Sequence, residues 1–72
     1  MTAIPIANRI RRLRFECGEM TQEALANACG VTRQTIIALE AERYGTSLEL
    51  AFKSARAFGV GVEDVFLWKD GA

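Results

Sequence analysis

The chain of 72 residues carries nine basic and nine acidic side chains, has no histidine, and is half apolar. Residues 1–72 are expected to form a single domain, near the lower size limit for one core without disulfides or metals, so dimerisation would add useful burial. Zero net charge argues against a protein that coats nucleic acid without sequence specificity, because such proteins need a large excess of basic residues. No apolar run approaches the roughly 20 residues of a membrane span.

The spacing of apolar residues and of capping residues predicts five helices. No alternating β-branched run is long enough for a sheet, so the expected fold class is all-α. The first helix is indicated by Ile6, Ile10, Leu13 and Cys17, which recur at helical intervals before Gly18, a suitable C-terminal cap. A helix over about residues 6–17 therefore opens the predicted fold.

Two short helices follow, each after a threonine that can cap it. Thr21 precedes a predicted helix over Gln22–Cys29, and Thr32 precedes one over 33–42. The connection between them is only a few residues long, so the two helices must pack as neighbours.

The run QEALANACGVTRQTIIALE, residues 22–40, has the pattern of a helix-turn-helix. Ala26 supplies a small residue where a second helix crosses closely. Gly30 tolerates the positive φ that a tight turn requires. The apolar residues that the second helix can bury are Val31, Ile36 and Leu39. Together these features predict a helix-turn-helix over residues 22–42.

Two further helices complete the predicted set. Ser47 can cap a fourth helix over Leu48–Phe58, and a short fifth helix is expected over about 62–66. Glu63 and Asp64 lie at the positive N-terminal end of this fifth helix, where acidic side chains are favourable.

The two ends of the chain are less regular. Residues 2–5 and 66–69 can each be extended and can pair as a small two-stranded antiparallel ribbon, which the residues alone leave open. Several apolar side chains remain unassigned to the core and suit a self-complementary two-fold interface: Ile4, Val65, Phe66, Leu67 and Trp68. A dimerisation region is therefore predicted within residues 60–69.

Laid out in order, these segments resemble the Cro/phage-repressor helix-turn-helix family, often called XRE-like. The matching pieces are NRIRRLR (8–14), MTQEALA (20–26), GVTRQTIIALE (30–40), SLELAFKSARAFGV (47–60) and VEDVF (62–66). The end FLW (66–68) is similar to that of small cytolysin-repressor-like regulators, which are dimers with a terminal β-ribbon. The resemblance implies a five-helix, lambda-repressor-like domain and a homodimeric repressor. Ala41-Glu42 stands where the family often has Asn-Gly, so the third helix is expected to run further.

Helical geometry predicts which face of the third helix meets DNA. The side packed on the core is expected to hold Ile36, Leu39, Glu40 and Arg43. Steps of about 100° per residue then put the opposite face at Gln34, Ile37, Ala38 and Ala41. Glutamine can pair with adenine, arginine with guanine, and apolar groups with thymine methyls. The predicted base readers are Arg33, Gln34, Ile37 and Ala38, and the resemblance implies the same role for three of these positions, Arg33, Gln34 and Ala38.

Other residues are expected to hold the phosphate backbone or the fold. The resemblance implies that Gln22, at the start of the second helix, is a phosphate clamp, where backbone N–H groups and the helix dipole suit an anionic oxygen. Further predicted backbone contacts, which fix register without reading sequence, are Thr32, Thr35 and Arg43. The resemblance also implies a partly buried structural ion pair between Arg14 and Glu40.

These features predict a regulator that binds the major groove of double-stranded DNA as a homodimer on a two-fold symmetric operator. An enzyme is not expected, since there is no histidine, no phosphate-cradling glycine loop and no evident acidic pair. No cofactor or metal is expected either, because Cys17 and Cys29 lack the spacing of a zinc site. The N-terminus lacks the order of a signal peptide, which predicts a cytoplasmic protein with no membrane partner.

An alternative function belongs to a different class. A protein-interaction module, such as an antitoxin or adaptor, could keep the same fold without reading DNA. The combination of Arg33, Gln34 and Gln22 favours the DNA-binding interpretation, because a module that does not bind DNA would not require all three residues.

Overall fold

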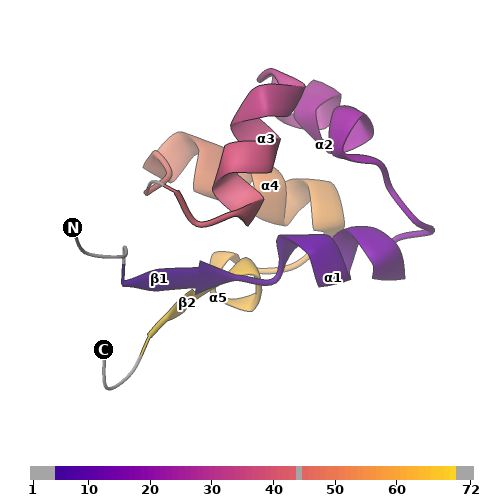
Figure 1. Ribbon diagram of the computed structural model, residues 1–72. Helices are drawn as coiled ribbons and strands as arrows, with labels where there is room; N and C mark the ends of the chain where they lie inside the picture. The colour runs from indigo at the N-terminus through magenta and orange to yellow at the C-terminus, as the bar shows by residue number, and fades with distance from the viewer. Residues whose placement is uncertain (1–4, 44, 70–72) are drawn as a thin grey trace.

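The computed structural model describes residues 5–43 and 45–69. Its elements in chain order are β1 (Ile6–Asn8), α1 (Ile10–Glu16), α2 (Gln22–Cys29), α3 (Arg33–Glu40), α4 (Leu48–Phe58), α5 (Val62–Val65) and β2 (Phe66–Trp68). Figure 1 shows α2 and α3 on one side of α4, with α1 and the ribbon of β1 and β2 below. The described residues thus confirm the predicted helical fold of five helices with a small antiparallel ribbon.

Three helices begin at the hydroxyl residues predicted to cap them. In each case the side-chain oxygen accepts a hydrogen bond from the backbone N–H three residues on, which satisfies a donor that the helix itself leaves unpaired. The pairs are Thr21 with Ala24 at 2.9 Å, Thr32 with Thr35 at 3.2 Å, and Ser47 with Leu50 at 3.1 Å. Gly30, at φ 71°, ends α2 in the left-handed conformation that the tight turn requires.

The core is built from side chains of all five helices. Its buried members are Ile10, Leu25, Ala26, Cys29, Ile36, Leu39, Leu50, Ala55, Phe58 and Val65. Ser54 is fully buried beside them, and its hydroxyl donates a hydrogen bond of 3.0 Å to the carbonyl of Ala51 one turn back. Both cysteines are free, and burial raises the pKa of the Cys29 thiol although Lys53 opposes the shift.

The N-terminal boundary of the first helix differs from the prediction. Ile6 lies in β1 rather than in a helix, and α1 begins at Ile10. The Asn8 side-chain oxygen accepts a hydrogen bond of 3.2 Å from the Ile10 N–H, so the chain turns from strand to helix at this point. Helical spacing of apolar residues did not distinguish a strand that leads into a helix from a longer helix.

The ribbon pairs β1 with β2 in antiparallel register. Ile6 lies opposite Trp68, and Asn8 lies opposite Phe66. The predicted N-terminal strand over residues 2–5 is therefore displaced toward the helix. Residues 2–4 lie outside the described residues, while the carbonyl of Pro5 accepts a hydrogen bond of 2.8 Å from the Lys69 N–H. The fifth helix ends at Val65 because Phe66 has already entered the strand.

The expectation that the third helix runs to about residue 42 is wrong, because α3 ends at Glu40. Glu42 adopts a left-handed backbone with φ 58°. Its N–H donates to the carbonyl of Leu39 at 3.1 Å, and the Arg43 N–H donates to that of Ala38 at 3.1 Å. This is the Schellman arrangement that usually has glycine at the left-handed position.

The left-handed turn at Glu42 predicts an unusual order of stability among variants. Replacing Glu42 with Ala or with Gly removes the same side-chain contacts, but only Ala keeps a Cβ that clashes in this conformation. We expect Glu42→Gly to be more stable than Glu42→Ala by about 1 kcal/mol, even after the greater unfolded-state entropy of glycine. Urea denaturation followed by circular dichroism measures this difference, and a more stable Ala variant would show that the turn is not left-handed in solution.

Candidate nucleic-acid interface

The start of α3 presents polar side chains to solvent. Arg33 and Gln34, its first two residues, are exposed, whereas Ile36 and Leu39 on the opposite side are buried. The face opposite the core also holds Ile37 and Ala38, both half-buried, and Ala41, which is exposed just beyond the helix end. The first turn of α3 is therefore its most accessible part.

One residue assigned to the packed side of the third helix is not buried. Arg43 is exposed and lies beyond the end of α3, because the left-handed turn at Glu42 carries the chain away from the helix axis. Extrapolating helical periodicity past Glu40 placed it wrongly.

The Thr32 and Thr35 hydroxyls lie together at the start of α3. Their oxygens are 3.0 Å apart, and the Thr32 oxygen also caps the helix by accepting from the Thr35 N–H. Thr32 is exposed and Thr35 is half-buried. Both hydroxyls thus flank the exposed turn that carries Arg33 and Gln34.

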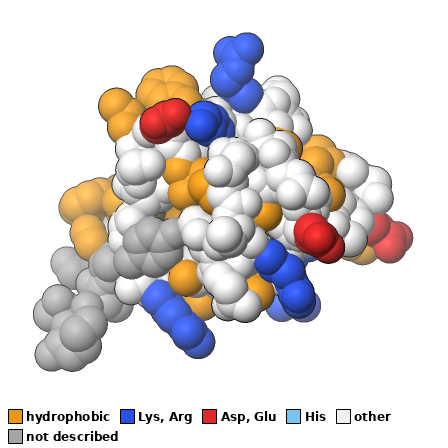
Figure 2. All heavy atoms as spheres, turned by 90° about the horizontal axis from the view of Figure 1, so that it is seen from above, with side chains coloured by type: hydrophobic (Ala, Val, Ile, Leu, Met, Phe, Trp, Pro, Cys, Tyr) orange, Lys and Arg blue, Asp and Glu red, His pale blue; other side chains and the backbone are white. Residues whose placement is uncertain are grey.

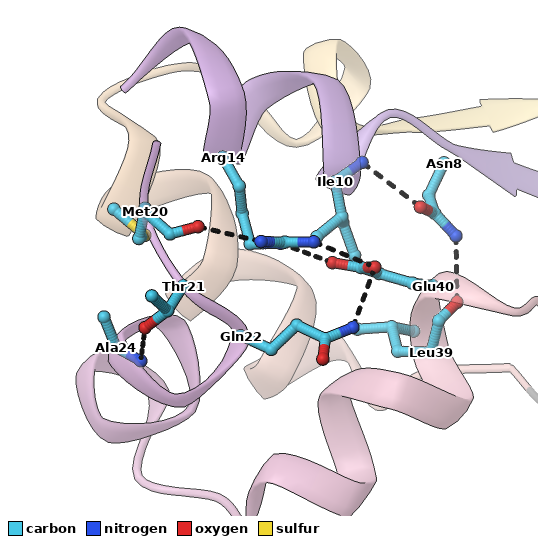
Figure 3. A network of polar contacts seen from close by, with 9 residues as sticks. All are labelled: Asn8, Ile10, Arg14, Met20, Thr21, Gln22, Ala24, Leu39 and Glu40. Atoms are coloured by element: carbon cyan, nitrogen blue, oxygen red, sulfur yellow. Dashed lines mark hydrogen bonds and ion pairs between the residues drawn. The ribbon is translucent and has the colours of Figure 1, made fainter. Parts of the chain in front are cut away.

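Three helices meet at the carboxylate of Glu40 (Figure 3). Arg14 of α1 contacts it twice, with Nε 2.6 Å from Oε2 and Nη2 3.3 Å from Oε1. Gln22, the first residue of α2, donates from Nε2 to Oε1 at 3.2 Å. The Arg14 and Glu40 side chains are 15% and 11% exposed, so this pair is largely removed from water.

Arg14 also fixes the loop between α1 and α2. Its Nη1 donates to the Met20 carbonyl at 2.8 Å, and the Met20 N–H donates to the Arg14 carbonyl at 2.8 Å. The loop is held from both sides just before Thr21 begins α2, so the first turn of α2 has a defined position relative to α3.

An open hollow of about 540 Å³ lies beside this network. It is bounded by side chains of α1, of the start of α2, and of both ends of α3: Arg11, Arg14, Thr21, Gln22, Glu23, Arg33 and Glu40. Gln22, the predicted phosphate clamp, and Arg33, a predicted base reader, therefore line the same hollow. Backbone N–H groups and the dipole at the start of α2 favour an anion here.

The hollow has a small excess of positive charge, because three arginines line it with two glutamates, and only Arg14 is paired with one of them, Glu40. Several acidic side chains are already paired elsewhere, in the ion pairs Arg12–Glu16, Lys53–Glu49 and Lys69–Glu42. By contrast, the side chains of Arg11, Arg33 and Arg43 are exposed and make no hydrogen bond or ion pair with any other described residue. Figure 2 shows basic side chains projecting from the surface, several along its lower edge. A molecule of zero net charge thus has locally unpaired cations.

Sequence reasoning missed two features of this surface. The sequence pattern assigned no role to Arg11, although three-to-four-residue spacing places it on the same side of α1 as Arg14. The bond from Gln22 to Glu40 was not foreseen either, because nothing local indicates that residues 18 positions apart share a carboxylate.

The predicted dimer residues divide into different groups. Val65 is fully buried in the core, so assigning it to a dimer surface was wrong: α5 uses it to pack the fold. Phe66 packs partly against the core, Leu67 is half-buried, and Trp68 is 68% exposed. Ile4 lies outside the described residues. Alternation along β2 also places Leu67 on the opposite face from Phe66 and Trp68.

Two properties of the described residues bear on other functions. No group of three or more His, Cys, Asp or Glu side chains among residues 5–43 and 45–69 could hold a metal ion. No helix in the same part of the chain is long and apolar enough to cross a membrane.

The two short helices joined at Gly30, with an exposed polar start to the second and a cationic hollow beside the first, define a helix-turn-helix DNA-binding protein. Comparison with known proteins agrees. Residues 18–65 match the model of a helix-turn-helix family, which together with the relatives shows that this chain belongs to the XRE-like helix-turn-helix family of transcriptional regulators.

Relatives that are similar along most of the chain carry the same description. An uncharacterized HTH-type transcriptional regulator of Methanothermobacter thermautotrophicus is 57% identical over 65 residues, covering 88% of this chain and 93% of the relative. One from Methanocaldococcus jannaschii is 57% identical over 51 residues, covering 71% and 77%. The regulator YgzD of Bacillus subtilis is 46% identical over 59 residues, covering 82% and 88%.

A solved structure has a similar fold. The crystal structure of the hypothetical transcription factor NHTF from Neisseria superposes with a TM-score of 0.69 at 34% identity. The match covers 76% of this chain and 62% of the Neisseria chain. Family and relatives together support DNA binding in transcription regulation as the activity of this protein, rather than catalysis.

The shared carboxylate predicts a large stability loss when Glu40 is removed. Glu40→Ala leaves the Arg14 guanidinium largely desolvated without its partner, and we expect a loss of about 2–3 kcal/mol, somewhat below that for a fully buried pair. Glu16→Ala is a matched control, because it removes the glutamate of the exposed Arg12–Glu16 pair and is expected to cost at most about 0.5 kcal/mol. Equal losses in urea denaturation would show that the Glu40 network does not hold the helices together.

Proposed function

We propose that this protein is a homodimeric repressor that acts in the cytoplasm and reads a two-fold symmetric operator through the major groove. The observation that carries the proposal is the exposed first turn of α3, with Arg33 and Gln34, next to the cationic hollow at the start of α2. In a dimer, the two recognition helices would enter successive major grooves about 34 Å apart.

Base reading is assigned to the exposed face of α3. The Gln34 amide can pair with adenine in a bidentate manner, and Arg33 can pair with guanine. Ile37 and Ala38 are half-buried, so their contribution is limited to apolar contact with thymine methyls. With so few base-contacting residues, one protomer discriminates only weakly between sequences at one half-site. Binding of a second protomer to the other half-site is therefore part of recognition.

Phosphate contacts are assigned to the residues that surround this face. Gln22 gives one amide hydrogen to Glu40, which holds the side chain in place, and its second amide hydrogen remains for a phosphate oxygen. Thr32, Thr35 and Arg43 extend these contacts on either side of α3. These interactions would fix register and carry no sequence information.

Self-association is assigned to the ribbon. Trp68 is a large apolar side chain that is 68% exposed, and Ile6 lies directly opposite it on the same face of the ribbon. A ribbon of two strands also leaves one edge of each strand open, and such edges are favourable sites for a second copy. Phe66, which shares this face, would add partial burial at the contact, and Leu67 would contribute from the opposite face of the ribbon.

Selection from random double-stranded DNA by the purified protein tests the whole proposal. The expected result is enrichment of a site with two-fold symmetry, with half-sites about one helical turn apart. Enrichment of an asymmetric site would remove the dimeric mode while keeping DNA reading, and no enrichment would overturn the proposal.

Gln34→Ala tests base reading directly. Loss of a bidentate pair should weaken binding to the selected site by about 1–3 kcal/mol and relax preference at one base pair. Asn27→Ala is the matched control, since it removes an exposed helical amide from α2 away from the hollow and should leave binding unchanged. Equal weakening on every DNA sequence would show that Gln34 does not read a base.

Trp68→Ala tests the dimer contact. Truncating a central aromatic anchor typically costs about 2 kcal/mol or more, so the dimer dissociation constant should rise at least about thirtyfold in sedimentation equilibrium. Phe15→Ala removes another exposed aromatic side chain, from α1, and should leave the association unchanged. A Trp68→Ala protein that dimerises like wild type would place the interface elsewhere.

A protein-interaction module is the second candidate. It is favoured by one observation: Leu48 and Phe52, one turn apart on α4, are 73% and 53% exposed. In this case selection would enrich no DNA sequence, and Gln34→Ala would have no effect on binding of the partner protein.

A further inference from the structure

The C-terminal end of the recognition helix is tied to the ribbon by a side chain of β1. Asn8 donates from Nδ2 to the Leu39 carbonyl in the last turn of α3 at 2.9 Å, and its Oδ1 accepts from the Ile10 N–H at 3.2 Å. Figure 3 shows this amide lying between the start of α1 and the end of α3. One side chain thus links the ribbon, α1 and α3.

A residue that follows β2 reaches the same turn. Lys69 Nζ lies 2.8 Å from Glu42 Oε1, with side chains that are 31% and 30% exposed. The Lys69 N–H also donates to the Pro5 carbonyl at 2.8 Å, which extends the ribbon to this position. Both halves of the ribbon therefore contact the turn that ends α3.

The bond from Asn8 is not needed to satisfy the Leu39 carbonyl. That oxygen already accepts the Glu42 N–H at 3.1 Å, as the Schellman turn requires. The Asn8 bond uses the second lone pair of the carbonyl. Its effect is to restrain where the end of α3 lies relative to the ribbon.

We propose that Asn8 and Lys69 are positioning residues that set the tilt of α3 in the DNA groove, so that the ribbon controls base reading without touching a base. The inference rests on the proposed function, in which Arg33 and Gln34 read bases. Neither Asn8 nor Lys69 belongs to the predicted DNA surface.

The geometry of α3 makes its tilt important. A helix of eight residues is about 12 Å long, so a rotation of about 10° at one end displaces the other end by about 2 Å. A hydrogen bond to a base edge does not survive a displacement of that size. Restraint at Leu39 and Glu42 is therefore transmitted along the rigid helix to Arg33 and Gln34.

A positioning residue and a purely stabilising residue differ in which property of DNA binding they change. A residue that only stabilises the fold changes the folded fraction, and hence all DNA binding alike. A positioning residue changes the ratio between affinity for the selected site and affinity for a scrambled duplex of equal length. Charge changes cancel in that ratio, because both duplexes carry the same phosphates.

Two substitutions separate the contacts. Asn8→Asp keeps an oxygen that can accept the Ile10 N–H but loses the donor to Leu39. Lys69→Met removes the ion pair with Glu42. Lys53→Met is the matched control, since it breaks the exposed Glu49–Lys53 pair on α4 with the same change of charge. All are measured at a temperature where urea denaturation shows them to be folded.

The expected result is a loss of selectivity with little loss of general binding. The affinity ratio should fall about tenfold for Asn8→Asp, which is within the value of one good base contact, and about threefold for Lys69→Met, which is below it. Lys53→Met should leave the ratio unchanged. Combined with Gln34→Ala, Asn8→Asp should lower the ratio by clearly less than its tenfold effect alone, because only the Arg33 contact remains to be positioned.

The outcomes separate this inference from the proposed function. A selective wild-type protein whose ratio is unchanged in Asn8→Asp and Lys69→Met overturns the positioning role alone. A wild-type protein with no preference for any DNA sequence overturns the proposed function and the inference with it. If Asn8→Asp does not fold, Lys69→Met decides, because its partly exposed side chain can be replaced without opening the core.

Discussion

The arrangement of the proposed DNA surface depends on the carboxylate of Glu40. It lies near the end of α3 and holds both Arg14 of α1 and Gln22 of α2, while Arg14 reaches further to the Met20 carbonyl. Short helices have little intrinsic stability and need tertiary contacts to fix their directions. One desolvated charge cluster provides such contacts among three helices, and it does so on the side where a phosphate would approach. Stability and the geometry of recognition therefore rest on the same residue.

Around this cluster, the two ends of α3 serve different purposes. The first turn exposes the side chains of Arg33 and Gln34 to solvent, with Thr32 as a cap. The last turn is held by a left-handed residue, by an amide from β1 and by a lysine that follows β2. A helix whose last turn is held and whose first turn is exposed can present side chains to a DNA groove with little rearrangement of its backbone. The low conformational cost of such preorganisation favours affinity.

Much of the helical framework could be predicted because it depends on local chemistry. Thr21, Thr32 and Ser47 begin helices through their own hydroxyls, and Gly30 ends one through its own backbone freedom. The failures lie where distant segments decide. Ile6 has helical spacing, but it lies in a strand because it pairs with Trp68, about 60 positions away. Val65 is not needed by the local helical pattern, but it is fully buried in the core of the folded chain. Glu42 takes a conformation that its residue type disfavours, at the turn that Lys69 contacts.

The pairing of Ile6 with Trp68 also affects the order of folding. These residues are about 60 positions apart, so closing the ribbon costs more chain entropy than any of the short helix-to-helix connections. Contacts of this range form late, after the locally connected helices have collapsed. The helices from α1 to α5 can therefore assemble before the ribbon closes and brings Asn8 and Lys69 to the end of α3. If Asn8 and Lys69 position α3 as proposed, the helical body would therefore form before the protein could discriminate between DNA sequences.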